Sequence, residues 1–108
     1  MMPRIGELRR RIAIETASDV ADGAGGSVRS WTPAGTVHGR IEPRRRAERV
    51  ENGRLSGLVT HRVTLRAGAT VTGGARLVAD GVRYRVLVVE DHDPQRRFID
   101  CLCEEEQA

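Results

Sequence analysis

The segment 58–66 constrains the fold more than any other part of this 108-residue chain. Apolar residues and one histidine occupy alternate positions, and threonines and arginines fill the positions between them. Successive side chains of a β-strand point to opposite faces, so this alternation predicts a strand with one dry face and one solvated face. The dry face would carry Val59, His61, Val63 and Leu65, and the solvated face Thr60, Arg62, Thr64 and Arg66.

Further alternating segments recur along the chain, with turn residues between them. Asp80-Gly81 lies between two apolar runs and is a strong signal for a two-residue hairpin turn. Pro33 and Gly35 interrupt another alternating segment and predict a bulge or bend there. About six short strands without a long amphipathic helix indicate an all-β fold. We expect a small antiparallel β-barrel or sandwich, in a single domain that covers residues 1–108.

An arginine-rich connection, residues 42–57, lies between two of the predicted strands and has almost no apolar periodicity. We expect a long loop between the second and third strands, which can carry a short helical turn over residues 47–52. Connections of this length are uncommon in small domains unless they are functional, so this loop is predicted to be the working part. Its candidate contact residues are Arg44, Arg45, Arg46, Glu48, Arg49, Glu51 and Arg54.

The charge of the chain is compatible with two roles for this connection. All 18 basic residues are arginine, and the formal net charge is +3. Arginine pairs with phosphates and carboxylates through two parallel hydrogen bonds, which suits DNA backbones and subunit interfaces alike. A solvated surface loop, whose arginines are offset by its own glutamates, is the alternative interpretation.

No pattern in the sequence points to a catalytic, cofactor or metal site. The histidines and cysteines do not have the spacing of tetrahedral zinc ligands. The glycine cluster in the predicted loop 17–27 lacks the nucleotide-binding consensus, and no helix is predicted after it. No apolar run approaches the ~20 residues of a membrane span. The residues considered as metal ligands are His38, His61, His92, Cys101 and Cys103.

The two cysteines and the one tryptophan allow further predictions. Cys101 and Cys103 lie two positions apart on a predicted strand, a geometry that strains a mutual disulfide, so both are expected to be free thiols. Cys103 is expected to be the more open to solvent because it is nearer the chain end. Trp31 is expected to anchor a core or an interface.

Several segments together carry a resemblance to a known family. They are GELRRRIAIE at residues 6–15, Trp31 with VHGRIEP at 37–43, THRVTLR at 60–66, and DGVRYRVLVVEDHDPQRRFIDCLCEE at 80–105. In this order they cover nearly the whole chain. The chain resembles the head-tail adaptor or head-closure (stopper) proteins of long-tailed phages and gene transfer agents.

The resemblance implies a structural role without catalysis or cofactor. It implies a β-barrel that forms a six- or twelve-fold ring between a portal or adaptor ring and a tail terminator or tail tube. The connection 42–57 would face the channel for double-stranded DNA, in a virion or virus-like particle assembled in the bacterial cytoplasm. Whether Arg44–Arg46 would contact DNA, bridge to Glu48 or Glu51 of adjacent subunits, or lie on the barrel wall stays open. The loop 17–27 and the tail 104–108 are candidates for contacts with adjoining rings.

Two other functions are compatible with the same residues. A nucleic-acid-binding barrel of the OB or SH3-like kind would use Arg62, Arg66, Arg83 and Arg85 on a sheet face. Only three aromatic residues are present, which disfavours a base-stacking surface. A neighbouring connector part such as the tail terminator is the other alternative.

Overall fold

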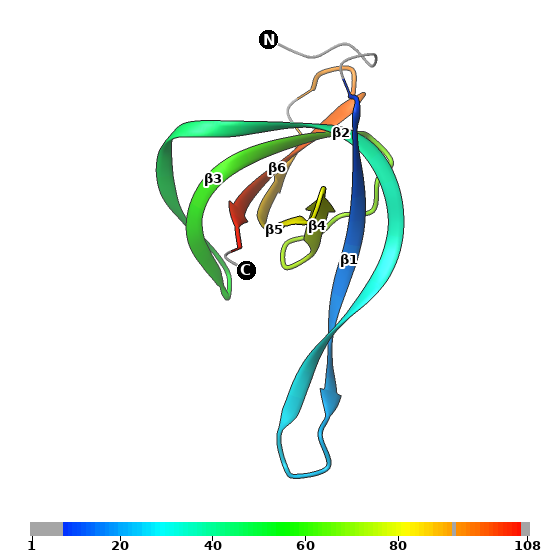
Figure 1. The fold of residues 1–108 in the computed structure, drawn as a ribbon. Helices are drawn as coiled ribbons and strands as arrows, with labels where there is room; N and C mark the ends of the chain where they lie inside the picture. Colours follow the sequence, from blue (N-terminus) through cyan, green and yellow to red (C-terminus); the bar gives the residue numbers. More distant parts are fainter. Residues whose placement is uncertain (1–7, 92, 107–108) are drawn as a thin grey trace.

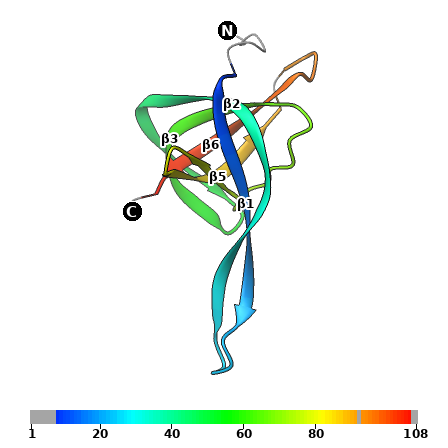
Figure 2. The same ribbon diagram turned by 45° about the vertical axis from the view of Figure 1, so that its right-hand side comes forward.

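The structure is a computed structural model that describes residues 8–91 and 93–106. Six antiparallel strands form one sheet that closes into a barrel in the order β1-β2-β3-β6-β5-β4 (Figures 1 and 2). No helix occurs in the described residues, and therefore none that could cross a membrane. The all-β prediction is confirmed. The strands are β1 (Arg10–Ala21), β2 (Ser27–Asn52), β3 (Leu55–Arg66), β4 (Arg76–Ala79), β5 (Val82–Glu90) and β6 (Phe98–Glu105).

The predicted dry face of β3 lines the interior of the barrel. Val63 and Leu65 are fully buried, and Arg62 and Arg66 on the outer face are exposed. Thr64, which was predicted to be solvated, is instead only 3% exposed and donates a 2.8 Å hydrogen bond to Asp100. The core is therefore built from the alternating inward positions of the strands, as the sequence predicts. It contains Ile12, Ile14, Val63, Leu65, Val71, Ala75, Leu77, Ala79, Tyr84, Val86, Cys101 and Cys103.

Two predicted irregularities are confirmed. Asp80 and Gly81 both have positive φ, 51° and 80°, as a type I′ hairpin turn requires, and they join β4 to β5. On β2, Ile14 faces Gly35 and Glu15 faces Pro33, so Ala34 is an extra residue and forms a bulge. The bulged residue thus lies between Pro33 and Gly35, two residues that disfavour a regular strand interior.

The alternation expected along β5 changes at a second bulge. Strict alternation would place Val88 on the same face as Val86, but the register shifts between these two residues. Leu87 is fully buried at the bulge, and Val89 lies opposite the inward-facing Cys101. Val89 therefore packs on the core.

The cysteines are free thiols, as predicted, but Cys103 is not open to solvent. Both sulfur-bearing side chains are fully buried, because β6 is paired with β3 and with β5 at Cys103. Burial raises the pKa of Cys101 to about 12 and also raises the pKa of Cys103. The prediction that Cys103 is exposed because it is near the chain end is therefore wrong.

Residues 16–33 form a two-stranded arm that projects from the barrel (Figure 1). The predicted loop 17–27 is shorter than expected, because β1 continues to Ala21 and β2 begins at Ser27. Val20 and Val28 face each other across the arm and are 54% and 58% exposed. At the base of the arm, the guanidinium of Arg76 lies 4.1 Å from the ring centre of Trp31.

Gly39 sits where three neighbours leave no room for a side chain. A Cβ there would lie 2.6 Å from Leu65 Cδ2, 2.7 Å from Ile12 Cδ1 and 2.9 Å from the carbonyl oxygen of Thr64. We therefore expect Gly39→Ala to lower the free energy of unfolding by about 1–3 kcal/mol, since overpacked cores must shift. Urea denaturation measures this change. Thr36→Ala, at an exposed position of the same strand, is the control, and equal stability of both variants contradicts the packing.

The buried thiols should be inert in the folded protein. At about pH 8, Cys101 and Cys103 are protonated because burial raises both pKa values, whereas ordinary thiols ionise near that pH. Alkylation by iodoacetamide, followed by mass spectrometry, should therefore be slow in buffer and fast in denaturant. Rapid modification of Cys103 in the folded chain would show that the end of β6 opens to solvent.

Candidate functional site: the arginine hairpin

The predicted loop 42–57 is a β-hairpin, which we call the arginine hairpin. Strand β2 continues to Asn52 and β3 begins at Leu55, so only Gly53 and Arg54 form the turn. Gly53 has a φ of 62°, which glycine adopts without steric cost. The predicted helical turn at 47–52 is wrong, because residues 48–52 pair with residues 55–59 of β3.

A bulge divides the arginine hairpin from the barrel wall. Pro43 pairs with His61 and Glu48 pairs with Val59, so residues 44–47 have only Thr60 opposite them. Bulges of this kind bend a strand and redirect the part of the strand beyond them. The outer part of the hairpin, residues 48–59, therefore has its own ladder and its own orientation.

Hydrogen bonds hold the outer part of the hairpin against β5 and β6. Asn52 Nδ2 donates to the carbonyl oxygen of Leu87 at 3.0 Å. Arg85 donates from one terminal nitrogen to the carbonyl oxygen of Ser56 and to Glu104 Oε1, each at 3.0 Å. We call these three side chains, Asn52, Arg85 and Glu104, the clasp. The segment is thus ordered in the single subunit and is not a free loop.

Two glycines permit this close approach. At Gly57, a Cβ would lie 2.6 Å from Glu104 Oε1 and 3.2 Å from Leu87 Cδ1. At Gly73, in the connection before β4, a Cβ would lie 2.9 Å from Leu55 Cδ1. Neither the two glycines nor the clasp as a unit was predicted from the sequence. An isolated glycine within a strand pattern, such as Gly57, is the signal for a close approach that could have indicated it.

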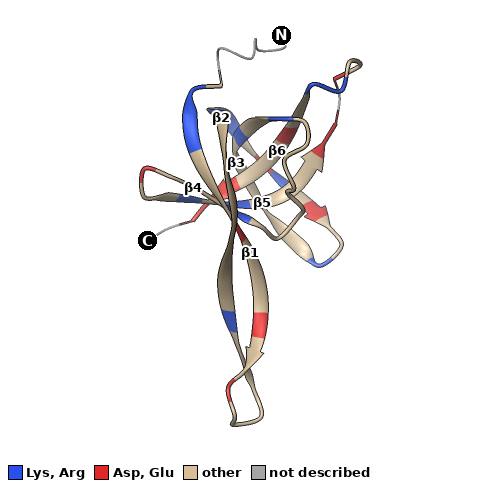
Figure 3. Ribbon diagram, turned by 90° about the vertical axis from the view of Figure 1, so that its right-hand side faces the viewer, with Lys and Arg blue, Asp and Glu red and all other residues tan. Residues whose placement is uncertain are grey.

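The charged residues of the predicted site lie together on this hairpin, and most of their side chains are exposed. Figure 3 marks the basic and acidic positions along the ribbon. Arg44 is half-buried and lies 3.8 Å from Glu48. The other six members are either exposed cations or exposed glutamates. Five arginines against two glutamates give residues 44–54 a net charge of +3. The exposed members are Arg45, Arg46, Glu48, Arg49, Glu51 and Arg54.

The alternative basic face is divided by the barrel topology. Arg62 and Arg66 lie on β3, whereas Arg83 and Arg85 lie on β5, and β6 runs between these strands. Strand β6 brings acidic residues into this gap, and Arg85 is bonded to one of them, Glu104. The four arginines therefore do not form one uninterrupted cationic surface.

The histidines and cysteines do not converge in the described part of the chain. No group of three or more potential ligands there could hold a metal ion. His61 shares a 2.9 Å hydrogen bond between its Nδ1 and Thr60 Oγ1, and its ring contacts Tyr84 edge-on at 5.0 Å. His61 is therefore a hydrogen-bonded group beside the core. His92 lies outside the described residues.

Comparisons with known proteins agree with this architecture. One chain from the virion of a native gene transfer agent particle has 25% sequence identity and a TM-score of 0.71, over 99% of this chain and 100% of that chain. Protein SF1141 from Shigella flexneri 2a has the same fold, with 21% identity, a TM-score of 0.67, and coverage of 95% and 96%. No curated protein matches the chain significantly.

The profile of the phage head completion proteins matches residues 3–106. This match spans all six strands, the arm and the arginine hairpin. The chain therefore belongs to the phage head completion protein family and is a structural protein of a phage-type particle.

Proposed function

We propose that the chain forms a ring in the head-tail connector, which closes the DNA-filled head and docks the tail. The observation that carries this proposal is the match to the head completion family over residues 3–106. A chain of the same fold and length in the virion of a gene transfer agent supports the same placement. The adaptor or portal ring would lie on one side and the tail terminator or tail tube on the other.

In this proposal the arginine hairpin faces the DNA channel. Arg45, Arg46, Arg49 and Arg54 are exposed on a hairpin whose position is fixed by the clasp. Guanidinium groups attract DNA phosphates without reading base sequence. A ring repeats this arrangement once per subunit, so a small attraction per hairpin adds to a large effect on the retained DNA.

The bulge at residues 44–47 is the hinge in this proposal. It has no ladder partners on β3, so a change of direction there breaks no strand pairing. Movement of the outer hairpin would instead break the clasp and the bond from Leu58 N to Glu104, and would disturb the packing of the buried Val59. Docking of the tail would shift the hairpin about this hinge and widen the channel, a rearrangement of the hinge type.

Charge removal tests the gating role. We expect Arg45→Gln, Arg46→Gln and Arg49→Gln together to leave the barrel folded, because these side chains are exposed. Heads that carry this triple variant should lose packaged DNA several-fold more often than wild-type heads, since the attraction to phosphates is reduced. Nuclease protection of the DNA in purified particles measures the loss.

The matched control removes the same charge elsewhere. Arg11, Arg62 and Arg83 are also exposed, and their replacement by Gln should leave DNA retention unchanged. Deletion of residues 44–53 should produce the same leakage as the hairpin triple variant, with the barrel intact. Filled, tailed and infectious particles from this deletion contradict the gating role. Equal leakage from both triple variants assigns the effect to overall charge instead.

A further inference from the structure

The backbone ladder between β3 and β6 ends where the arginine hairpin begins. It runs from Arg66 opposite Phe98 to His61 opposite Cys103. Beyond that pair, no ladder joins the outer part of the hairpin, residues 48–59, to the described end of β6. The position of the outer hairpin relative to the barrel therefore depends on bonds that involve side chains.

The end of β6 supplies such bonds at two points. Glu105 N donates to Thr60 Oγ1 at 2.8 Å, opposite the bulge at residues 44–47. Two residues farther into the hairpin, Leu58 N donates to Glu104 Oε2 at 3.4 Å. The other carboxylate oxygen of Glu104 accepts from Arg85, which also donates to the carbonyl oxygen of Ser56. One carboxylate thus links the outer hairpin to β5 and β6.

Gly57 lets the hairpin fit closely around this carboxylate. A Cβ at this position would lie 2.6 Å from Glu104 Oε1 and 3.0 Å from a terminal nitrogen of Arg85. Both atoms are the ends of flexible side chains, so a methyl group there would displace the ion pair before it displaced the strand. Gly57→Ala consequently disturbs the contact of Glu104 without removing a charge.

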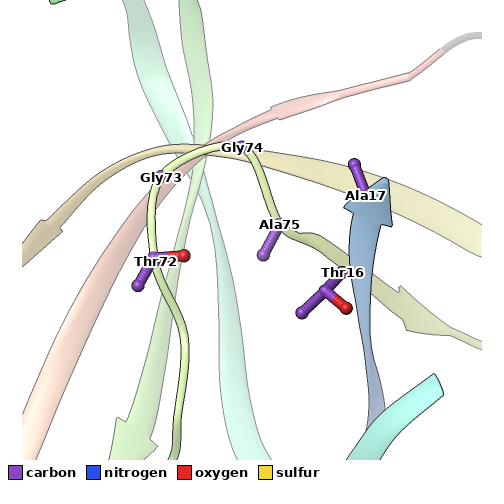
Figure 4. A pocket seen from close by; sticks show the side chains of 6 residues that line it. All are labelled: Thr16, Ala17, Thr72, Gly73, Gly74 and Ala75. Carbon is purple, nitrogen blue, oxygen red and sulfur yellow. The ribbon is translucent and has the colours of Figure 1, made fainter. Parts of the chain in front are cut away.

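The apolar contacts of the hairpin restrain its rotation less. Val59 is buried, but it adjoins Thr60 at the bulge, where a rotation displaces atoms least. Leu55 approaches Gly73 in the connection before β4. That connection borders a hollow of about 150 Å³ (Figure 4) and has room to shift there. The residues that line the hollow are Thr16, Ala17, Thr72, Gly73, Gly74 and Ala75.

The strength of the Glu104 link suits a contact that is made and broken. Hydrogen bonds to a carboxylate are stronger than neutral ones such as the bond from Asn52 to Leu87. The side chains of Arg85 and Glu104 are nevertheless 33% and 30% exposed, so solvent and salt screen the pair. The link can therefore be broken while the barrel stays folded.

We infer that Glu104 is the positioning residue that sets the orientation of the arginine hairpin, and that displacement of the end of β6 releases the hairpin. The release rests on the proposed function, in which the hairpin moves about the bulge at residues 44–47. Glu104 and Glu105 pair with β5 on one edge and hold the hairpin on the other. Docking that draws this chain end away from the hairpin would thereby free it.

The distance from the hairpin turn to the barrel wall tests this role in the purified full-length subunit. Nitroxide labels on Arg54→Cys and Arg11→Cys, both at exposed positions, report the distance by pulsed electron paramagnetic resonance. The native thiols are buried and stay unlabelled, and excess unlabelled chain suppresses distances between copies. We expect one narrow distance distribution for the wild-type hairpin and at least a twofold broader one with Glu104→Ala. Gly57→Ala should also broaden the distribution.

The matched control removes a carboxylate from the hairpin itself. Glu51 is exposed, and Glu51→Ala should leave the distribution narrow. Asn52→Ala removes one neutral hydrogen bond and should broaden the distribution less than Glu104→Ala. Deletion of residues 104–108 should broaden it as much as Glu104→Ala does. Circular dichroism verifies that each variant is folded, and Gly57→Ala keeps the test decisive if Glu104→Ala unfolds.

Three results overturn the role of Glu104. An unchanged narrow distribution in both Glu104→Ala and Gly57→Ala shows that apolar packing holds the hairpin. A larger effect of Asn52→Ala than of Glu104→Ala assigns the orientation to Asn52. A narrow distribution after deletion of residues 104–108 shows that the end of β6 does not control the hairpin.

Failure of the proposed function gives a different result. The distance measurement uses the subunit alone and depends neither on the ring nor on DNA. A broad distribution for Glu104→Ala, combined with normal DNA retention by particles that carry this variant, supports the positioning role and contradicts the gating role of the hairpin.

Discussion

The short contact between β4 and β1 closes the barrel, and the arm begins where this contact ends. It comprises three residue pairs and ends at Glu15 and Arg76, whose side chains form a 2.7 Å ion pair with limited solvent exposure. A hydrogen bond between two charged groups in such a setting is stronger than a neutral one. Arg76 also covers the ring of Trp31. Arg76 therefore lies at the point where the closed barrel ends and the arm begins.

Two long hairpins extend from the closed barrel, and they lie differently relative to it. The arm extends away from it, and every residue from Thr16 to Ser30 is exposed. The arginine hairpin bends back over β5, because the bulge at residues 44–47 redirects it and Gly57 lets it approach Leu87. Its cations are thereby held in place without being buried. A positioned but exposed cationic surface suits repeated, weak contact with a polyanion.

The sequence predicted the parts of this structure that face the core. Alternation identified the walls of the barrel, Asp80-Gly81 identified a tight turn, and Pro33 identified the bulge on β2. Residues 48–52 were not recognised as strand, because they lie outside the barrel and only Val50 among them is apolar. The candidate residues were identified by charge. The clasp was not, because it joins Asn52, Arg85 and Glu104, which are distant in sequence.

The proposed function depends on where the arginine hairpin lies in an assembled particle. A cryo-electron microscopy map of the connector, with the head filled, measures this position directly. We expect a ring of barrels in which the turns at Gly53 and Arg54 from neighbouring copies surround the DNA. A ring in which these turns point outward, away from the channel, contradicts it.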